Sequence, residues 1–334
     1  MSSISELRQD IVSGDWVVIA TGRAKRPHDF LQQERESFIQ PKAACPFERL
    51  DEPALAEYPH PRSGASDQWW VKVVANKYPA FGPGACGITH EAGPYHWTDG
   101  VGFHEVVATA DHERSLALMS NDEVELVLRA YQERYAVLRA GPCVGYVSIF
   151  HNHGRLAGAT ISHPHSQIIA IPVVPPDIRR SLEGSGRYFH ERKACVHCAM
   201  IAHERHQQKR LIFENDGFVV FAPFASKTAF EIRIFPKEHS PRFEAMDGAG
   251  RAAAAEALRV PLAKLFAGLK NPDYNMFIHT APVDGSDEYP HYHWHMEILP
   301  KTSIWAGFEI GTGIEISTIA PESAAEFLRE VDMY

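Results

Sequence analysis

Two histidine-rich stretches carry the residues of this chain that are best suited to chemistry. The first, residues 163–167, reads His-Pro-His-Ser-Gln, and the second, residues 291–295, has a histidine at every other position. If each stretch is a strand, alternate side chains point to the same face, so His163, His165 and Gln167 share one surface. Imidazoles on one face can hold a metal ion, attack a phosphorus atom, or do both.

His165 is the candidate nucleophile. An imidazole can attack phosphorus when one ring nitrogen is unprotonated and a hydrogen bond to the other nitrogen fixes the tautomer. Gln167, on the same face, could donate a hydrogen bond to phosphoryl oxygens. Upstream, Asn152 and Thr160 bound a loop of small residues that could cradle phosphate, although both are also ordinary turn formers. The alternative is that both histidines of the H-x-H bind metal and do no chemistry.

An internal repeat relates the two halves of the chain. His112 precedes His163 by 51 residues, and His239 precedes His291 by 52. A tyrosine also stands 17 residues before His163 and 17 before His291. Coincidence among common residue types is the competing explanation, but a repeat predicts that each half builds its own metal site.

The repeat predicts two sets of metal ligands. The second half offers two thiolates and two imidazoles, a tetrahedral zinc shell, from Cys195, Cys198, His239 and His291. The equivalent positions of the first half are Cys45, Glu48, His112 and His163. A carboxylate there makes a harder site that zinc still accepts. Alternatively, Glu48 is a solvated loop residue and the first site holds no metal, so we expect one or two zinc ions per chain.

The elements expected around these residues form an α+β fold. Each half has the pattern strand, strand, helix, strand, strand, which predicts an antiparallel sheet with one long helix. In the first half, Ser120 and Glu123 form a capping box that begins a helix ending at Gly141. In the second half, Pro261 interrupts the helix predicted over residues 251–269 or starts another. The charged segment 179–193 is expected to be the crossing between two domains, residues 1–180 and 190–334.

Composition narrows the class of protein. The chain has 334 residues, 45% hydrophobic and 22% charged, as is typical of globular proteins. A net charge of −9 argues against a general nucleic-acid binder, and no apolar stretch is long enough to span a membrane. The first residues lack the pattern of a secretory signal, so we expect a cytoplasmic enzyme. Five cysteines are too sparse for a disulfide scaffold, and Cys86 and Cys143 are expected to be solitary buried residues.

Several motifs together resemble the galactose-1-phosphate uridylyltransferase family of the histidine-triad superfamily, across nearly the whole chain. The motifs are the H-P-H-x-Q element, Asn152, Asp111-His112, residues 14–20, 23–27, 76–79, 307–309 and 311–313. The resemblance implies two tandem histidine-triad-like domains, whose sheets form one continuous or half-barrel sheet.

The resemblance also implies roles for individual residues. His165 would be the covalent nucleophile and Gln167 would contact the phosphoryl group. The substrate-binding residues would be Asn152 and Thr160 at phosphate, Asn76 near the nucleoside, Arg23 and Arg26 at phosphate groups across a dimer interface, and Phe308 and Glu309 at the hexose. The expected assembly is a homodimer, and the expected partners are a nucleotide sugar and a hexose 1-phosphate.

The expected reaction is a double displacement like that of UDP-glucose:galactose-1-phosphate uridylyltransferases, through a nucleotidyl-histidine. The chain departs from the family's pattern in several places. The family's first zinc site usually has C-x-x-C where this chain has Cys45 and Glu48, and Ser166 stands where many members have Gly. Ser166 and the C-x-x-C that begins at Cys195 resemble an ADP-glucose phosphorylase branch of the family. This resemblance implies the alternative of an ADP-sugar phosphorylase or adenylyltransferase that uses inorganic phosphate. A zinc-stabilised nucleotide-binding protein without turnover is a third hypothesis. The sequence leaves open the base, the acceptor and the metal.

Overall fold

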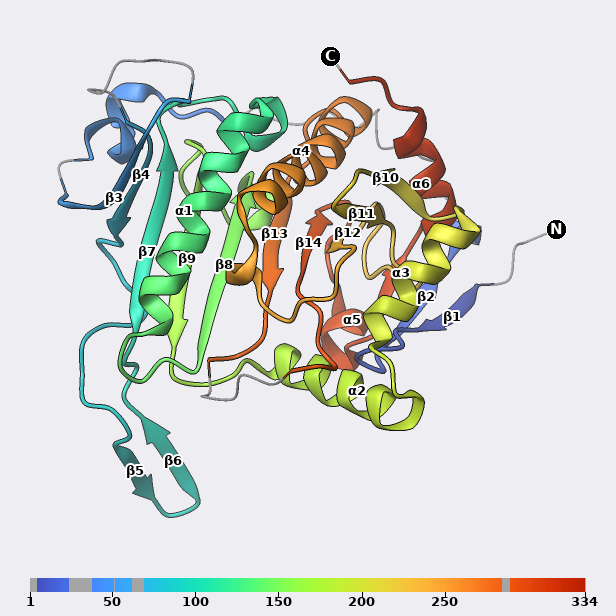
Figure 1. Ribbon diagram of the computed structural model, residues 1–334, viewed down its shortest axis with the longest axis horizontal. Helices are drawn as coiled ribbons and strands as arrows, with labels where there is room; N and C mark the ends of the chain where they lie inside the picture. The colour runs from blue at the N-terminus through green and yellow to red at the C-terminus, as the bar shows by residue number, and fades with distance from the viewer. Residues whose placement is uncertain (1–4, 24–37, 51, 62–68, 284–288, 334) are drawn as a thin grey trace.

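The structure, a computed structural model, describes residues 5–23, 38–50, 52–61, 69–283 and 289–333. Its centre is one ten-stranded antiparallel sheet (Figure 1). From edge to edge the strands are β10 (Leu211–Glu214), β11 (Phe218–Phe221), β12 (Ile232–Pro236), β14 (His295–Pro300), β13 (Tyr274–His279), β8 (Tyr146–His153), β9 (His165–Ile171), β7 (Phe103–Thr109), β4 (Trp69–Ala75) and β3 (Ala54–Pro59).

Each half contributes five strands, and from its edge to the middle of the sheet they follow the same order: first, second, third, fifth and fourth along the chain. The two halves meet where β8 pairs with β13, and there Phe150 lies directly opposite Phe277. The α+β class with a large antiparallel sheet is therefore confirmed. The strands of both halves are joined in one hydrogen-bonded sheet, while the division into domains 1–180 and 190–334 stays a prediction.

Two long helices, α1 (Asn121–Arg139) and α4 (Gly248–Leu269), lie side by side across one face of the sheet (Figure 1). The predicted capping box is present, because Ser120 accepts a hydrogen bond from the Glu123 N–H and Glu123 accepts one from the Ser120 N–H. The expectation at Pro261 was wrong, since α4 continues through this residue. Tertiary packing outweighs the cost of the lost helical hydrogen bond, as Pro261 is buried among apolar neighbours.

Smaller elements surround the sheet. They are the helices α2 (Pro176–Arg192), α3 (Val196–Gln207), α5 (Gly307–Thr312) and α6 (Pro321–Glu330), a three-stranded sheet of β1 (Glu6–Gln9), β2 (Trp16–Ile19) and β15 (Glu315–Ser317), and a hairpin of β5 (Thr89–Ala92) and β6 (Tyr95–Thr98). The segment expected to be a crossing connection is thus mostly the helix α2. The hairpin projects from the body of the molecule (Figure 1).

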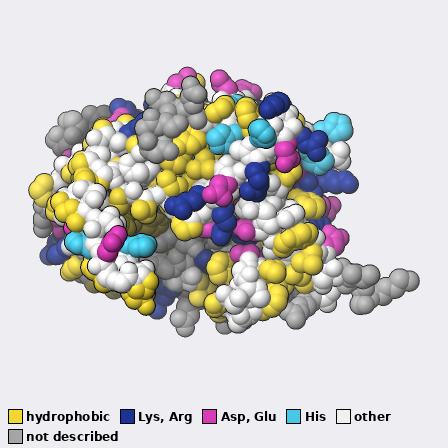
Figure 2. Space-filling view, turned by 90° about the horizontal axis from the view of Figure 1, so that it is seen from below, with side chains coloured by type: hydrophobic (Ala, Val, Ile, Leu, Met, Phe, Trp, Pro, Cys, Tyr) yellow, Lys and Arg dark blue, Asp and Glu magenta, His cyan; other side chains and the backbone are white. Residues whose placement is uncertain are grey.

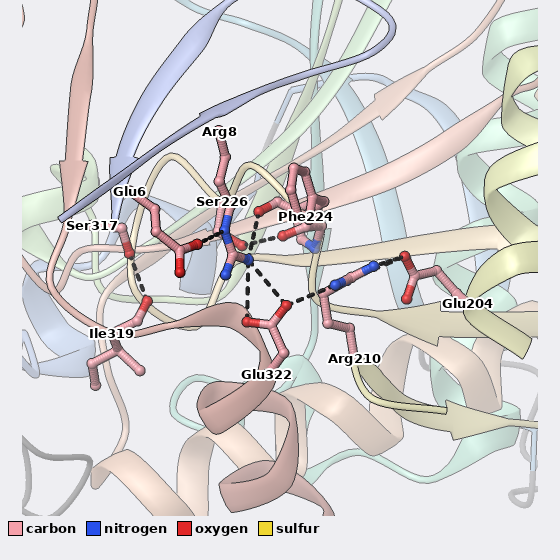
Figure 3. A network of polar contacts seen from close by, with 10 residues as sticks. Glu6, Arg8, Glu204, Arg210, Phe224, Ser226, Ser317, Ile319 and Glu322 are labelled. Atoms are coloured by element: carbon pink, nitrogen blue, oxygen red, sulfur yellow. Dashed lines mark hydrogen bonds and ion pairs between the residues drawn. The ribbon is translucent and has the colours of Figure 1, made fainter. Parts of the chain in front are cut away.

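A chain of ion pairs ties the N-terminal strand to the C-terminal helix (Figure 3). Arg8 of β1 lies 3.0 Å from Glu322 of α6. The same carboxylate lies 2.7 Å from Arg210, which pairs at 2.6 Å with Glu204 of α3. Because Arg8, Arg210 and Glu204 are buried, these charges fix the small sheet and α6 against the main sheet.

Cys86 and Cys143 are joined in a disulfide, with their Cα atoms 5.5 Å apart. The expectation that they are solitary was wrong. The bond links the segment before the β5–β6 hairpin to the loop after α1, which are 57 residues apart in sequence. Sequence spacing alone gave no sign of this pairing, because only the fold brings the two segments together.

Charge is mixed on the molecular surface. On the face shown in Figure 2, basic and acidic side chains lie beside one another in a central band. This face therefore offers no uniformly basic surface of the kind that binds nucleic-acid backbones. Within the described residues, none of the helices combines the length and the apolar character needed to cross a membrane.

Candidate active site and metal centres

Strand β9 presents His165 and Gln167 on the sheet face that lies away from the long helices. Between them, Ser166 points to the opposite face, where its hydroxyl contacts the Tyr131 hydroxyl of α1. Side chains alternate along a strand, so His165 and Gln167 face the other side. Gln167 lies opposite Val106 of β7 and Phe150 of β8.

His165 is held in the tautomer that a nucleophile requires. Its Nδ1 lies 2.9 Å from the carbonyl oxygen of His163, which can only accept, so Nδ1–H donates and Nε2 keeps its lone pair. Burial lowers the pKa of His165 below its ordinary value, which favours the neutral ring. The ring of Phe47, with its centroid 4.9 Å away, packs against the imidazole. His165 belongs to none of the groups of candidate metal ligands among the described residues.

Gln167 and Asn76 both lie beside a histidine that the sequence analysis did not select. Gln167 Oε1 lies 2.7 Å from Nε2 of His104, and Asn76 Nδ2 lies 3.0 Å from the same nitrogen. The signal available in the sequence was the position of His104, which shares a strand face with Val106 and so must lie near Gln167. A cavity of about 510 Å³ beside Asn76 and His104 is also lined by Phe103, Arg134 and Leu138, so it extends toward helix α1 and away from the face of His165.

The loop after β8 is held rigidly beside this face. Asn152, near the end of β8, accepts a hydrogen bond at 2.8 Å from Nδ2 of Asn275, its neighbour on β13. Gly154 has φ of 81° and packs so closely on Asp273 that a Cβ atom would clash with its carboxylate. Thr160 is exposed at the far end of the loop, where its carbonyl accepts from Gln40. Contact of Asn152 and Thr160 with phosphate stays a prediction.

Three of the four ligands predicted for the first metal site form one buried group, Cys45, His112 and His163. Cys45 Sγ lies 3.6 Å from Nδ1 of His163. Glu48 also turns toward this group, since its Oε1 lies 2.8 Å from Nδ1 of His112 and 3.6 Å from Nδ1 of His163. The carboxylate thus lies within reach of this group, and its role as a fourth ligand stays a prediction.

The second group contains Cys195, Cys198, His239 and His293, and it corrects one residue. His293 takes the place that the sequence analysis gave to His291. The Cys198 Sγ atom lies 3.4 Å from Nδ1 of His239 and 3.5 Å from Nδ1 of His293. His291 instead packs beside Phe189 of α2 and Tyr289.

The strand register explains the correction. Phe150 and Phe277 are equivalent, because they face each other where the two halves of the sheet meet. Phe150 precedes its partner Gln167 by 17 residues, whereas Phe277 precedes its partner Glu297 by 20. The second connection is three residues longer, so the spacing carried over from the first half stopped short of His293.

Both groups have the chemistry of zinc sites. The Nε2 atoms of His112, His163 and His293 lie 2.6–2.9 Å from backbone carbonyl oxygens and must donate to them, which leaves each Nδ1 for the cluster. With ordinary zinc bond lengths, a tetrahedral S···N edge measures about 3.6 Å, close to the distances above. The Cys198 thiol and the imidazoles of His197 and His293 lower the pKa of Cys195, and a thiolate is the form that binds metal.

A third group, His279, His295 and Glu297, is better explained as an internal ion pair. Glu297 Oε1 lies 2.7 Å from Nε of the buried Arg233, so its charge is already compensated. The rings of His279 and His295 stack with centroids 4.7 Å apart. A further cation beside Arg233 would be repelled.

Four predicted substrate contacts remain. Phe308 and Glu309 are on α5, where Glu309 accepts from the Ala306 N–H and Phe308 is half exposed. The backbone of Arg23 ends a short 3₁₀ helix, and Arg26 lies outside the described residues. The roles of all four residues stay predictions.

Comparison with known proteins decides the family. Residues 2–175 match the family model "Galactose-1-phosphate uridyl transferase, N-terminal domain". ADP-glucose phosphorylase of Arabidopsis thaliana is 35% identical over 98% of this chain and 93% of its own length. The chain belongs to the galactose-1-phosphate uridylyltransferase family.

Further sequence matches and superpositions cover nearly the whole chain. Galactose-1-phosphate uridylyltransferase of Thermotoga maritima is 27% identical over 98% of this chain and 99% of its own. The crystal structure of the Arabidopsis thaliana ADP-glucose phosphorylase with bound ADP-glucose superposes with a TM-score of 0.82 at 32% identity, covering 99% of this chain and all of that one. A uridylyltransferase structure superposes with a TM-score of 0.75 at 27% identity, with 98% of each chain covered. Residues 96–331 also match a family model of unknown function, DUF4921.

Proposed function

We propose that this protein transfers a nucleoside monophosphate from a nucleotide sugar to a phosphate acceptor, through a covalent bond to His165. The observation that carries the proposal is the division of labour between two histidines on one strand. His163 turns Nδ1 to a metal-ligand group, while His165 donates its Nδ1–H to a carbonyl and keeps Nε2 free on the sheet face beside Gln167.

The proposed reaction has two displacements at the α-phosphorus. In the first, the Nε2 lone pair of His165 forms a P–N bond while the P–O bond to the sugar phosphate breaks, so hexose 1-phosphate leaves with the electron pair. In the second, an acceptor phosphate oxygen forms a P–O bond and the P–N bond breaks, which returns the pair to Nε2. The acceptor is already anionic at neutral pH, so no strong general base is needed. Gln167 donates to the non-bridging oxygens.

Zinc at the two ligand groups would have a structural part in this scheme. Bound by Cys45, Glu48, His112 and His163, it would supply the rigidity that fixes the start of β9, two residues before the nucleophile. The group of Cys195, Cys198, His239 and His293 would do the same for β14 and α3. In each case the chain's own backbone carbonyls orient the imidazoles.

The first candidate donor is ADP-glucose, with inorganic phosphate as acceptor. It is supported by the 35% identity to an ADP-glucose phosphorylase over nearly the whole chain and by the superposition on that enzyme with ADP-glucose bound. The second candidate is UDP-glucose with galactose 1-phosphate, favoured by the family model over residues 2–175. Asn76, beside His104, is proposed to lie near the nucleoside for either base.

A substrate panel tests the proposal. ADP-glucose and UDP-glucose are each combined with inorganic phosphate and with galactose 1-phosphate, and products are separated by chromatography. We expect the fastest turnover with ADP-glucose and phosphate, and none with the His165→Asn variant. Fastest turnover with UDP-glucose and galactose 1-phosphate would select the second candidate. No turnover in any combination, with retained nucleotide binding, would support a binding protein instead.

We also propose a cytoplasmic homodimer in which four further residues complete the substrate site. Arg23 and Arg26 would reach phosphate groups across the interface, and Phe308 and Glu309 would approach the hexose. Sedimentation equilibrium gives the assembly directly. A monomer at micromolar concentration would contradict the shared site.

A further inference from the structure

We propose that His104 and Asn275 are positioning residues, which fix the amides of Gln167 and Asn152 so that both present NH₂ groups to the substrate. The inference rests on the proposed function and deepens it. Nothing in the residue types of the two amides decides which end faces an anionic phosphate. The surrounding hydrogen bonds do decide it. Each series of hydrogen bonds ends on a backbone group, the Ala80 N–H, which can only donate, or the Ala157 carbonyl oxygen, which can only accept.

The tautomer of His104 follows from its backbone partner. The Ala80 N–H lies 3.1 Å from Nδ1 of His104, and a backbone N–H can only donate, so Nδ1 is the acceptor. A neutral imidazole then carries its proton on Nε2. Nε2 lies 2.7 Å from Oε1 of Gln167, which must accept this proton. The carbonyl end of Gln167 is therefore occupied.

Asn76 does not compete for this proton. Its Oδ1 accepts from the Tyr78 N–H at 2.9 Å, so the group it turns to His104 is the NH₂, at 3.0 Å from Nε2. Two N–H donors cannot hydrogen-bond to each other. Gln167 is thus the partner of His104 Nε2–H, and its own NH₂ remains for the substrate.

Asn275 does the same for Asn152. Nδ2 of Asn275 lies 2.8 Å from the carbonyl oxygen of Ala157, which can only accept, so this end of the amide is the NH₂. Its second hydrogen is directed to Oδ1 of Asn152, also at 2.8 Å. The carbonyl end of Asn152 is occupied in turn, and its NH₂ is free.

Both free NH₂ groups belong to the sheet face that carries His165. Asn152 is two residues beyond Phe150, which pairs directly with Gln167, so all these side chains share one face. A rotated amide would present oxygen to the phosphoryl oxygens and repel them. Donors fixed in advance stabilise developing charge without reorganisation during the reaction, which is the role assigned to His104 and Asn275.

The test measures single-turnover formation of the nucleotidyl adduct by rapid quench and intact mass, with ADP-glucose as the probe. His104→Phe fills the space without a donor, and Asn275→Asp is isosteric but cannot donate to Asn152. We expect each to slow adduct formation about 100-fold, the scale for one lost donor, with the Kd for ADP-glucose changed less than about threefold, since the loss falls on the transition state. His104→Gln, which keeps a donor near Nε2, should recover at least about tenfold of that loss.

Two further measurements distinguish a lost orientation of the Gln167 amide from general damage to the folded protein. In a Gln167→Ala background, His104→Phe should cost nothing more, because no amide is left to orient. His96→Phe on the exposed hairpin is the matched control and should match the wild type. In addition, ¹⁵N NMR of His104 should report the neutral Nε2–H tautomer, which also tests the inference should His104→Phe fail to fold.

Failure of the inference is distinguishable from failure of the proposed function. If the wild type forms an adduct but His104→Phe and Asn275→Asp form it at the wild-type rate, the positioning roles are overturned and the reaction stands. An Nδ1–H tautomer of His104 would also overturn them. If the wild type forms no adduct with ADP-glucose, nor with UDP-glucose in its place, the proposed function fails, while the tautomer can still be read.

Discussion

His165 and His295 hold equivalent places in the two halves of the sheet. Each donates its Nδ1–H to the carbonyl oxygen of the histidine two residues earlier, at 2.9 Å for His165 and 3.1 Å for His295. Their surroundings differ, because His295 is only 4% exposed and its ring stacks on those of Phe235 and His279. The second half thus retains the arrangement of the first but closes it with aromatic rings.

This asymmetry predicts different results for one substitution made in the two halves. His165→Asn should reduce turnover by at least about 10⁴-fold, the scale seen when a covalent nucleophile is removed. His295→Asn should leave adduct formation within about threefold and instead lower the free energy of unfolding by about 1–3 kcal/mol, because it disturbs a packed core. Steady-state rates and urea denaturation check both. Equal losses of activity from the two substitutions would contradict the assignment.

Metal content should separate His293 from His291. His293→Ala removes a ligand, so we expect the second site to lose its metal, whereas His291→Ala should keep it. A metal present at a thousand times its Kd stabilises the fold by about 4 kcal/mol, so His293→Ala should lose stability on this scale. Elemental analysis of the purified variants gives the stoichiometry. Metal loss from His291→Ala alone would restore the ligand set predicted from the sequence.

The disulfide between Cys86 and Cys143 should be visible in a thiol count. Denatured protein with chelator and no reductant should show three free thiols per chain, since the other cysteines are Cys45, Cys195 and Cys198. For a loop of 57 residues, the chain-entropy model predicts that Cys143→Ser costs about 4 kcal/mol. Adding Cys86→Ser to that variant should cost little more. Five free thiols would show that the bond does not form.

The buried Glu231 should make stability depend on pH. Burial and the neighbouring Glu297 raise the pKa of Glu231 to about 7, against the effect of Arg233. A carboxyl whose folded pKa exceeds its unfolded pKa binds more protons when folded, so this contribution to stability is full at low pH and is lost as pH rises from about 4.5 to about 7.

Glu231→Gln removes this loss. We expect the variant to be more stable than the wild type at pH 8, by a few kcal/mol at most, since one pKa unit corresponds to about 1.4 kcal/mol. At pH 4.5 the two should be nearly equal. Glu330→Gln, at an exposed position, is the control. Destabilisation of Glu231→Gln at pH 8 would show that pairing with Arg233 outweighs the cost of burying the Glu231 carboxylate.

The parts of this structure that the sequence could predict depend on local signals. Helix α1 was predicted from the capping box at Ser120 and the glycine at its end, and β9 from the alternation around His165. The candidate metal ligand His293 was missed because its position depends on the length of the β13–β14 connection, which periodicity does not report. His104 and the Cys86–Cys143 bond depend on which segments the sheet brings together, and that is a property of the whole fold.

The most direct test of the account is intact mass spectrometry after mixing the protein with ADP-glucose, and separately with UDP-glucose, without an acceptor. The account predicts a mass increase of one nucleoside monophosphate, present in the wild type, absent in His165→Asn, and discharged on addition of inorganic phosphate or galactose 1-phosphate. Turnover without any such adduct, or an adduct that persists in His165→Asn, would contradict a covalent role for His165.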